Sequence, residues 1–66
     1  MYVISKYYSD DNSGFAIVTT DVDGYNIEYY DNNNHKFFEE SYAGKSLHYV
    51  EDAAENWALG IKKLDI

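Results

Sequence analysis

The spacing of the apolar residues changes at Gly44, and this change constrains the fold more than any other feature of the sequence. Before Gly44, residues 2–42 contain short runs of β-branched and aromatic residues, which suit the pleated surface of strands. After Gly44, apolar residues recur three and four positions apart, which places them on one stripe of an α-helix. The members of this stripe are Leu47, Val50, Ala54, Trp57, Ile61 and Leu64. The sequence therefore predicts an α+β fold in which the strands come first and the helix last.

Four strands are predicted before the helix, over residues 2–8, 15–20, 25–30 and 36–42. Polar, turn-prone residues separate them, and Asp23-Gly24 is a dipeptide favoured in two-residue hairpins of type I′. Short connections between successive strands favour an antiparallel meander. The expected architecture is a four-stranded antiparallel meander followed by one C-terminal amphipathic helix packed on one sheet face (ββββα). Ser46 is the expected N-cap of the helix, and Gly60 is expected to weaken its interior.

The length of the chain limits how stable such a fold can be. Its 66 residues make a single domain, 1–66, whose core rarely supplies more than about 3–5 kcal/mol of net stability. No cysteine is present, so neither a disulfide nor a cysteine-ligated metal can add to it. We therefore expect dense aromatic packing and self-association to contribute.

Aromatic residues come in adjacent pairs within the predicted strands. The pairs are Tyr7-Tyr8, Tyr29-Tyr30 and Phe37-Phe38. Neighbouring side chains on a strand point to opposite faces, and one helix covers only one face of the sheet. Aromatic groups are therefore expected on the uncovered face. They either form cross-strand ladders or make an interface, to a partner protein or to a second copy in a homodimer.

The charge balance argues against several classes of function. Twelve acidic residues face five lysines and no arginine, a formal charge of −7, which would repel the phosphates of a nucleic acid. No apolar run suits a signal peptide or a membrane span, so we expect a cytoplasmic protein. The carboxylates serve either as a solvated, solubilising face or as a surface that attracts a basic partner.

The sequence predicts neither an enzyme nor a cofactor or metal site. Residues 44–46 (Gly-Lys-Ser) match the end of a phosphate-binding loop, but Glu39 stands where that loop needs a glycine. Residues 21–24 resemble a fragment of a calcium loop whose two ends are missing. His35 and His48 are the two histidines, and no recognisable nucleophile motif accompanies them.

We predict instead a partner-binding surface made mainly of carboxylates. Its expected members are Glu28, Tyr30, Asp31, Glu39, Glu40, Glu51, Asp52 and Glu55. Carboxylates two residues apart on a strand are separated by about 6.6 Å, which is of the same order as the spacing of phosphates along a nucleic-acid strand. A protein with such an array can occupy the basic groove of a nucleic-acid-binding protein.

In size, charge, the expected sheet and the amphipathic segment 51–60 (Glu-Asp-Ala-Ala-Glu-Asn-Trp-Ala-Leu-Gly), the chain resembles small acidic inhibitor proteins encoded by phages, of the anti-CRISPR and DNA-mimic type. This resemblance implies binding to a host bacterial protein, and inhibition or modulation of a nucleic-acid-binding defence or transcription protein. Residues 44–46 and Ala54 also resemble the helix entry of HicB-type antitoxins, whose final strand and DNA-binding extension have no counterpart here. The alternative function is thus an antitoxin-like or housekeeping interaction module without nucleic-acid mimicry.

Overall fold

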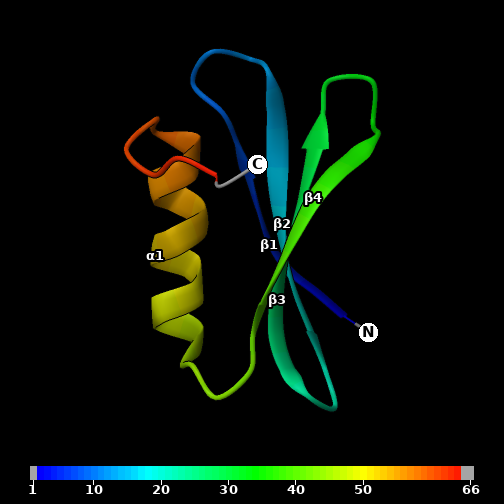
Figure 1. Ribbon diagram of the computed structural model, residues 1–66, viewed down its shortest axis with the longest axis vertical. Helices are drawn as coiled ribbons and strands as arrows, with labels where there is room; N and C mark the ends of the chain where they lie inside the picture. The colour runs from blue at the N-terminus through cyan, green and yellow to red at the C-terminus, as the bar shows by residue number, and fades with distance from the viewer. Residues whose placement is uncertain (1, 65–66) are drawn as a thin grey trace.

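Four antiparallel strands form one sheet in the order of the chain, and a single helix packs on one of its faces (Figure 1). The computed structural model describes residues 2–64. The elements are β1 (Tyr2–Tyr8), β2 (Gly14–Asp21), β3 (Gly24–Asp31), β4 (Lys36–Tyr42) and α1 (Leu47–Ala58). The predicted α+β meander with a C-terminal helix is confirmed. Within the described part of the chain, no helix is long and apolar enough to cross a membrane.

The core lies between α1 and the face of the sheet beneath it. Alternate residues of β2 and β3 point toward the helix, and the register pairs Ala16 with Tyr29 and Val18 with Ile27. The fully buried cluster consists of Ala16, Val18, Ile27, Tyr29, Val50 and Ala54. Tyr29 is the largest of these side chains, and its ring meets the Trp57 ring edge-on at 5.0 Å. Trp57, a member of the predicted apolar stripe, therefore contacts the sheet and lies half-buried at the margin of the core.

The helix begins as predicted but ends earlier. The Ser46 side chain accepts a hydrogen bond from the backbone N–H of Tyr49 at 3.2 Å, which confirms Ser46 as the N-cap. At the other end, Gly60 has a φ of 83°, and its N–H donates to the carbonyl of Trp57. The Ile61 N–H donates to the carbonyl of Asn56 at 2.8 Å, which completes a Schellman motif.

Gly60 is therefore the residue that terminates α1, and its predicted place in the helix interior is wrong. A left-handed residue stops the helical repeat, so the positions beyond it leave the predicted stripe. Ile61 is 69% exposed, whereas Leu64 returns to pack against the core from the segment after the helix.

The hairpin between β2 and β3 has a different turn from the one predicted. Asp21 pairs with Gly24, so the two connecting residues are Val22 and Asp23. A type I′ turn needs positive φ at both of these positions, and neither residue has it. A β-branched residue such as Val22 strongly disfavours that conformation. Gly24 instead takes a positive φ of 126° as the first residue of β3.

A bulge in β4 changes the predicted placement of one aromatic pair. Tyr29 pairs with Phe38 and Tyr30 pairs with Lys36, so Phe37 is an extra residue in β4. The rings of Phe37 and Phe38 both lie near the Tyr29 ring, with centroids 6.5 and 6.0 Å away. Strict alternation, which would send one of the two phenylalanines to the uncovered face, is therefore wrong for this pair.

The contact between Trp57 and Tyr29 predicts a large effect of removing the indole. Trp57→Ala should lower the free energy of unfolding by about 3 kcal/mol, because a large apolar side chain is lost from the edge of a small core. Ile61→Ala is the matched control, and should change it by less than about 0.5 kcal/mol because Ile61 is mostly exposed. Urea unfolding followed by circular dichroism measures both. Equal stability of the two variants would show that Trp57 does not hold the helix on the sheet.

Candidate functional site

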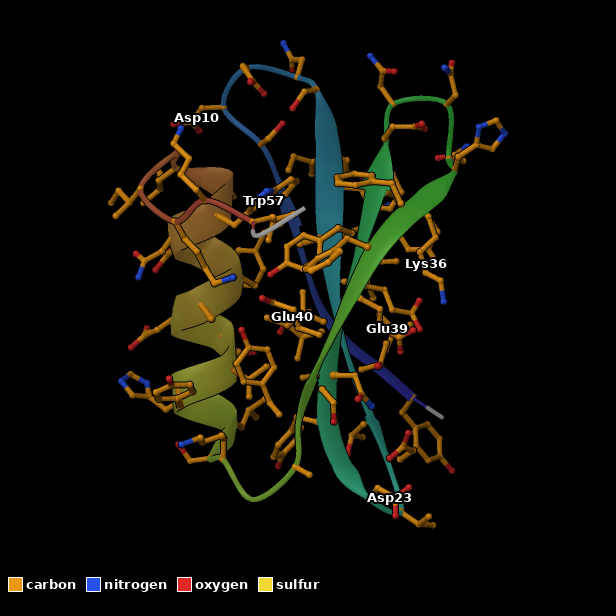
Figure 2. The ribbon with its side chains drawn as sticks, in the orientation of Figure 1. Asp10, Asp23, Lys36, Glu39, Glu40 and Trp57 are labelled. Carbon is orange, nitrogen blue, oxygen red and sulfur yellow. The ribbon has the colours of Figure 1, made fainter. Side chains whose placement is uncertain are left out.

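The eight predicted partner-binding residues do not form one surface. Glu39 and Glu40 are neighbours on β4 and therefore point to opposite faces of the sheet, as Figure 2 shows. Glu28 and Tyr30 share the face of Glu39, which is the face away from α1, here called the open face. The predicted residues fall into four places: the open face, the β3–β4 turn, the space between sheet and C-terminal segment, and α1.

On the open face, the two carboxylates are held by neighbouring groups. Glu28 and Glu39 lie directly opposite each other on β3 and β4, an arrangement in which like charges repel. The Tyr30 hydroxyl donates to Glu28 at 2.8 Å, and the Lys36 ammonium donates to Glu39 at 3.2 Å. The hydrogen bond to Glu39 and its charge raise the pKa of Lys36, and the bond to Glu28 raises the pKa of Tyr30. Lys36 thus compensates the charge of Glu39, whereas the nearly buried Glu28 is held by the neutral Tyr30 hydroxyl.

Asp31 organises the turn between β3 and β4. One of its carboxylate oxygens, Oδ1, accepts the backbone N–H groups of Asn33 at 2.9 Å and His35 at 3.0 Å. The bond from the His35 backbone, together with that from Asn33, lowers the pKa of Asp31. Asp31 therefore acts as a turn-forming residue in this structure.

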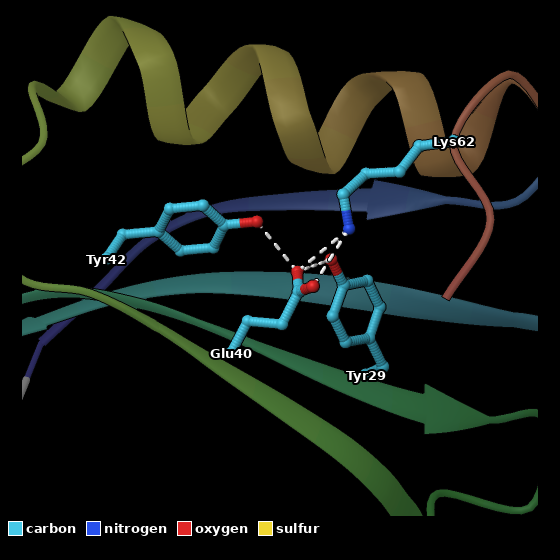
Figure 3. A network of polar contacts seen from close by, with 4 residues as sticks. All are labelled: Tyr29, Glu40, Tyr42 and Lys62. Atoms are coloured by element: carbon cyan, nitrogen blue, oxygen red, sulfur yellow. Dashed lines mark hydrogen bonds and ion pairs between the residues drawn. The ribbon is translucent and has the colours of Figure 1, made fainter. Parts of the chain in front are cut away.

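Glu40 lies on the helix side and joins the sheet to the segment after α1 (Figure 3). Its Oε1 accepts from the hydroxyls of Tyr29 at 2.7 Å and Tyr42 at 2.8 Å. The Lys62 ammonium lies 3.0 Å from both carboxylate oxygens. Burial alone would raise the pKa of Glu40, but these hydrogen bonds and the Lys62 charge lower it below its usual range.

This network uses most of the binding capacity of Glu40 within the protein. Burial, followed by the hydrogen bond to Glu40, raises the pKa of both Tyr29 and Tyr42. The side chain of Glu40 is only 24% exposed. The roles of Tyr42 and Lys62 were not predicted from the sequence. The only sequence signal was that Tyr42 lies two residues from Glu40 on the same strand, hence on the same face.

The last three residues of the predicted surface are carboxylates of α1, which face outward from the helix or along its flank. Glu51 accepts a hydrogen bond from the Ser5 hydroxyl, and Glu55 is exposed. Asp52 is 3.3 Å from His48, an ion pair only when the histidine is protonated. The segment Leu47–Ala58 contains no lysine or arginine. Three carboxylates thus lie within five residues, with no permanent positive charge on the same element.

Four of the five lysines of the chain contact groups other than the carboxylates of α1. Lys62 contacts Glu40, Lys36 contacts Glu39, Lys6 lies over the rings of Tyr8 and Phe15, and Lys45 lies over the Tyr49 ring. Within residues 2–64, no lysine forms an ion pair with Glu51, Asp52 or Glu55. Burial raises the pKa of Tyr7 beneath the helix, and the charges of Glu51, Glu55 and Asp52 raise it further. The helix therefore carries a negative field that nearby side chains do not neutralise.

The open face carries an aromatic ladder beside its charged half. The rings of Phe15 and Tyr30 stack at 5.1 Å with an angle of 8° between their planes, and Tyr8 lies 5.8 Å from Phe15. Lys6 places its ammonium 4.4 Å from the centre of the Phe15 ring. The prediction of aromatic groups on the uncovered face is therefore confirmed for the pairs that contain Tyr8 and Tyr30.

The hollows in the surface have linings of mixed polar and apolar character. One of about 380 Å³ lies between the β1–β2 turn and the end of α1, lined by Asp10, Trp57 and Lys63 among others. In the described chain, no three His, Asp or Glu side chains come together in a group that would hold a metal ion. No known protein family, curated protein or solved structure matches this chain.

The Glu40 network predicts a pH-dependent contribution to stability. The pKa of the Glu40 carboxyl is lower in the folded chain than the 4.5 of an unperturbed glutamate. The ionised carboxylate therefore contributes its full stabilisation of the fold above pH 4.5. This stabilisation is lost as the pH falls through the pKa of the folded state. Glu40→Gln should therefore lower the free energy of unfolding by about 1–2 kcal/mol at neutral pH, the range for hydrogen bonds to a partly exposed charged group. This difference from the parent should shrink in acid.

Urea unfolding at neutral pH and in acid, each for the parent and the variant, measures this change. Asp23→Asn is the control, because Asp23 is an exposed turn residue and should give the same small difference at both pH values. A difference between parent and Glu40→Gln that is independent of pH would show that the ionised carboxylate does not stabilise the fold.

Proposed function

We propose that this protein binds a basic bacterial protein through the carboxylates of α1, and thereby inhibits or modulates it. The target class that fits best is a nucleic-acid-binding defence or transcription protein in the cytoplasm of a bacterial host. The observation that carries the proposal is the uncompensated charge of α1. In the described chain, no lysine pairs with Glu51, Asp52 or Glu55. Lys36 and Lys62 pair instead with Glu39 and Glu40, respectively.

Electrostatics gives this helix two properties that suit such a function. Exposed charges act over a Debye length of about 10 Å at 0.1 M salt, so they can steer a basic partner before contact. Glu51 and Glu55 are one helical turn apart, an axial rise of about 6 Å. This separation is of the same order as the spacing of phosphates along a nucleic-acid strand. A groove that normally holds nucleic acid therefore offers complementary charge, and no catalytic group is needed for inhibition.

The proposed surface is smaller than the eight residues that the sequence suggested. Glu51, Asp52 and Glu55 form its centre, since they lie together on one element. Glu28, Tyr30 and Glu39 lie on the other face of the sheet, where they could meet only a partner that wraps around the edge. Asp31 and Glu40 act within the fold through the hydrogen bonds described above.

Affinity capture from a bacterial lysate tests the proposal with a matched pair of charge reversals. Glu55→Lys changes the charge of α1, and Asp23→Lys makes the same change at the distant β2–β3 turn (Figure 2). Proteins that bind the parent and Asp23→Lys should be lost from Glu55→Lys. The captured proteins should also be released when salt is raised from about 50 to about 500 mM, because screening weakens contacts between exposed charges. Added duplex DNA should release them as well.

Quantitative mass spectrometry of the captured proteins gives the readout. Capture that survives Glu55→Lys and high salt would contradict a role for the α1 carboxylates. Capture that depends on Glu55 but is unaffected by DNA would contradict nucleic-acid mimicry, and would favour an antitoxin-like or housekeeping interaction module.

We also propose weak homodimerisation through the apolar half of the open face. Val3, Tyr8, Phe15 and Ile17 belong to β1 and β2 on this face, where Val3 and Tyr8 are each 65% exposed. Sedimentation equilibrium should show a mass that rises with concentration from the 7.7 kDa of one chain, and Phe15→Ser should reduce the rise. A constant monomer mass for the parent at all concentrations would exclude this dimer.

A further inference from the structure

The outer edge of β1 is open. β1 is the first strand of the sheet, and in residues 2–64 no other strand pairs with its outer side. Only Ser5 and Tyr7 of this strand are partly buried, and both point toward α1. An edge of this kind presents unpaired backbone N–H and C=O groups, to which an extended segment of another chain can add as a strand.

The two edges of the sheet differ in how well they are protected. β4, the opposite edge, carries Glu39, Glu40 and Lys36 and is bulged at Phe37, features that discourage pairing. β1 carries no carboxylate and a single charged side chain, Lys6. Its register with β2 shifts between Val3 and Ser5, which leaves residues 5–8 as the regular part of the edge. The β1 edge is therefore the one open to pairing.

Two uncompensated carboxylates of α1 flank this regular part. The Ser5 hydroxyl donates a hydrogen bond to Glu51, which places that carboxylate above β1 on the helix side. Glu55 lies one helical turn after Glu51 and so projects from the same side of α1, in keeping with the charges of both raising the pKa of Tyr7. A strand added beside β1 would alternate its side chains between this acidic flank and the open face, where Lys6 and Tyr8 lie.

We propose that the β1 edge captures an extended basic segment of the partner protein as a fifth strand. Backbone pairing with β1 supplies the hydrogen bonds, and alternate lysine or arginine side chains of the segment meet Glu51 and Glu55. The intervening side chains are apolar and continue the exposed surface of Val3 and Tyr8 on the open face. This inference rests on the proposed function and specifies how a basic partner would dock.

Charge complementarity selects this occupant over a second copy of the chain. If two β1 strands paired antiparallel about a twofold axis, both α1 helices would lie on the same side of the joined sheet. The Glu51 and Glu55 carboxylates of the two copies would then face each other across the junction. The strand contains only Lys6 to offset them, and Lys6 points to the open face. A basic segment places positive charge at the same position.

A synthetic heptapeptide of alternating lysine and valine, with blocked ends, tests the proposal on the intact protein. Its matched control has the same sequence and charge but carries a methyl group on every backbone nitrogen, so that neither of its edges can pair along β1. The unmodified peptide should bind at least about tenfold tighter, which corresponds to the loss of one or two net hydrogen bonds. It should also slow amide hydrogen exchange in β1 while leaving β4 unchanged.

Protein variants add a test of the charge. Glu55→Lys should weaken binding of the unmodified peptide. Asp23→Lys makes the same charge change at the β2–β3 turn, beyond the strand positions that pair with residues 5–8, and should not weaken it. Equal binding of the two peptides would overturn the added strand and leave a purely electrostatic contact. A doubled mass with protected β1 amides before any peptide is added would show that a second copy holds the edge.

The outcomes also separate this inference from the proposed function. If lysate capture depends on Glu55 but the two peptides bind equally, the proposed function stands and the added strand is wrong. If capture is independent of Glu55 and the unmodified peptide still binds preferentially along β1, the edge binds extended segments but the acidic-helix function is wrong.

Discussion

A single helix of twelve residues has to cover one face of a four-stranded sheet, and most other features of the structure follow from this constraint. The helix can approach closely because alanines lie on both sides of the contact, at Ala16 and Ala54, while Tyr29 fills the space between them and Trp57. The helix lies over β1, β2 and β3, and it meets β4 at the contact between Tyr49 and Tyr42. Within residues 2–64, it leaves one face of the sheet uncovered and no further strand paired at either edge.

Beyond the end of α1, the Glu40 network holds the following segment of the chain against the sheet. After Gly60 terminates α1, the chain turns and brings Lys62 back toward the sheet, where it meets a carboxylate that already accepts two tyrosine hydroxyls. A partly buried carboxylate is stable only when its charge and hydrogen-bonding capacity are satisfied, and here three donors do so. The network has a consequence for the surface too. It engages Lys62, one of the five lysines of the chain, and within residues 2–64 no lysine pairs with Glu51, Asp52 or Glu55.

Uncompensated charge on α1 and the open edge of β1 lie side by side, and they have complementary roles in the proposed mode of binding. Exposed carboxylates act at long range and accelerate encounter, but such contacts contribute little to affinity once salt screens them. Backbone pairing along an edge strand acts only at contact, and it is much less sensitive to salt. In the proposed mode of binding, Glu51 and Glu55 attract the basic partner, and residues 5–8 of β1 hold it by backbone pairing.

The sequence by itself determined the type and order of the elements. Alternating and helical spacings of apolar residues are local properties, so the four strands, the helix and its N-cap at Ser46 could be predicted from them. Alternation also implied that Glu39 and Glu40 point in opposite directions, but only packing of α1 decided which of the two faces the core. The turn at Val22, the bulge at Phe37 and the contact of Lys62 with Glu40 were decided by the tertiary structure. Strand register and contacts between distant residues depend on many weak interactions across the whole fold. They therefore cannot be predicted from any short stretch of sequence.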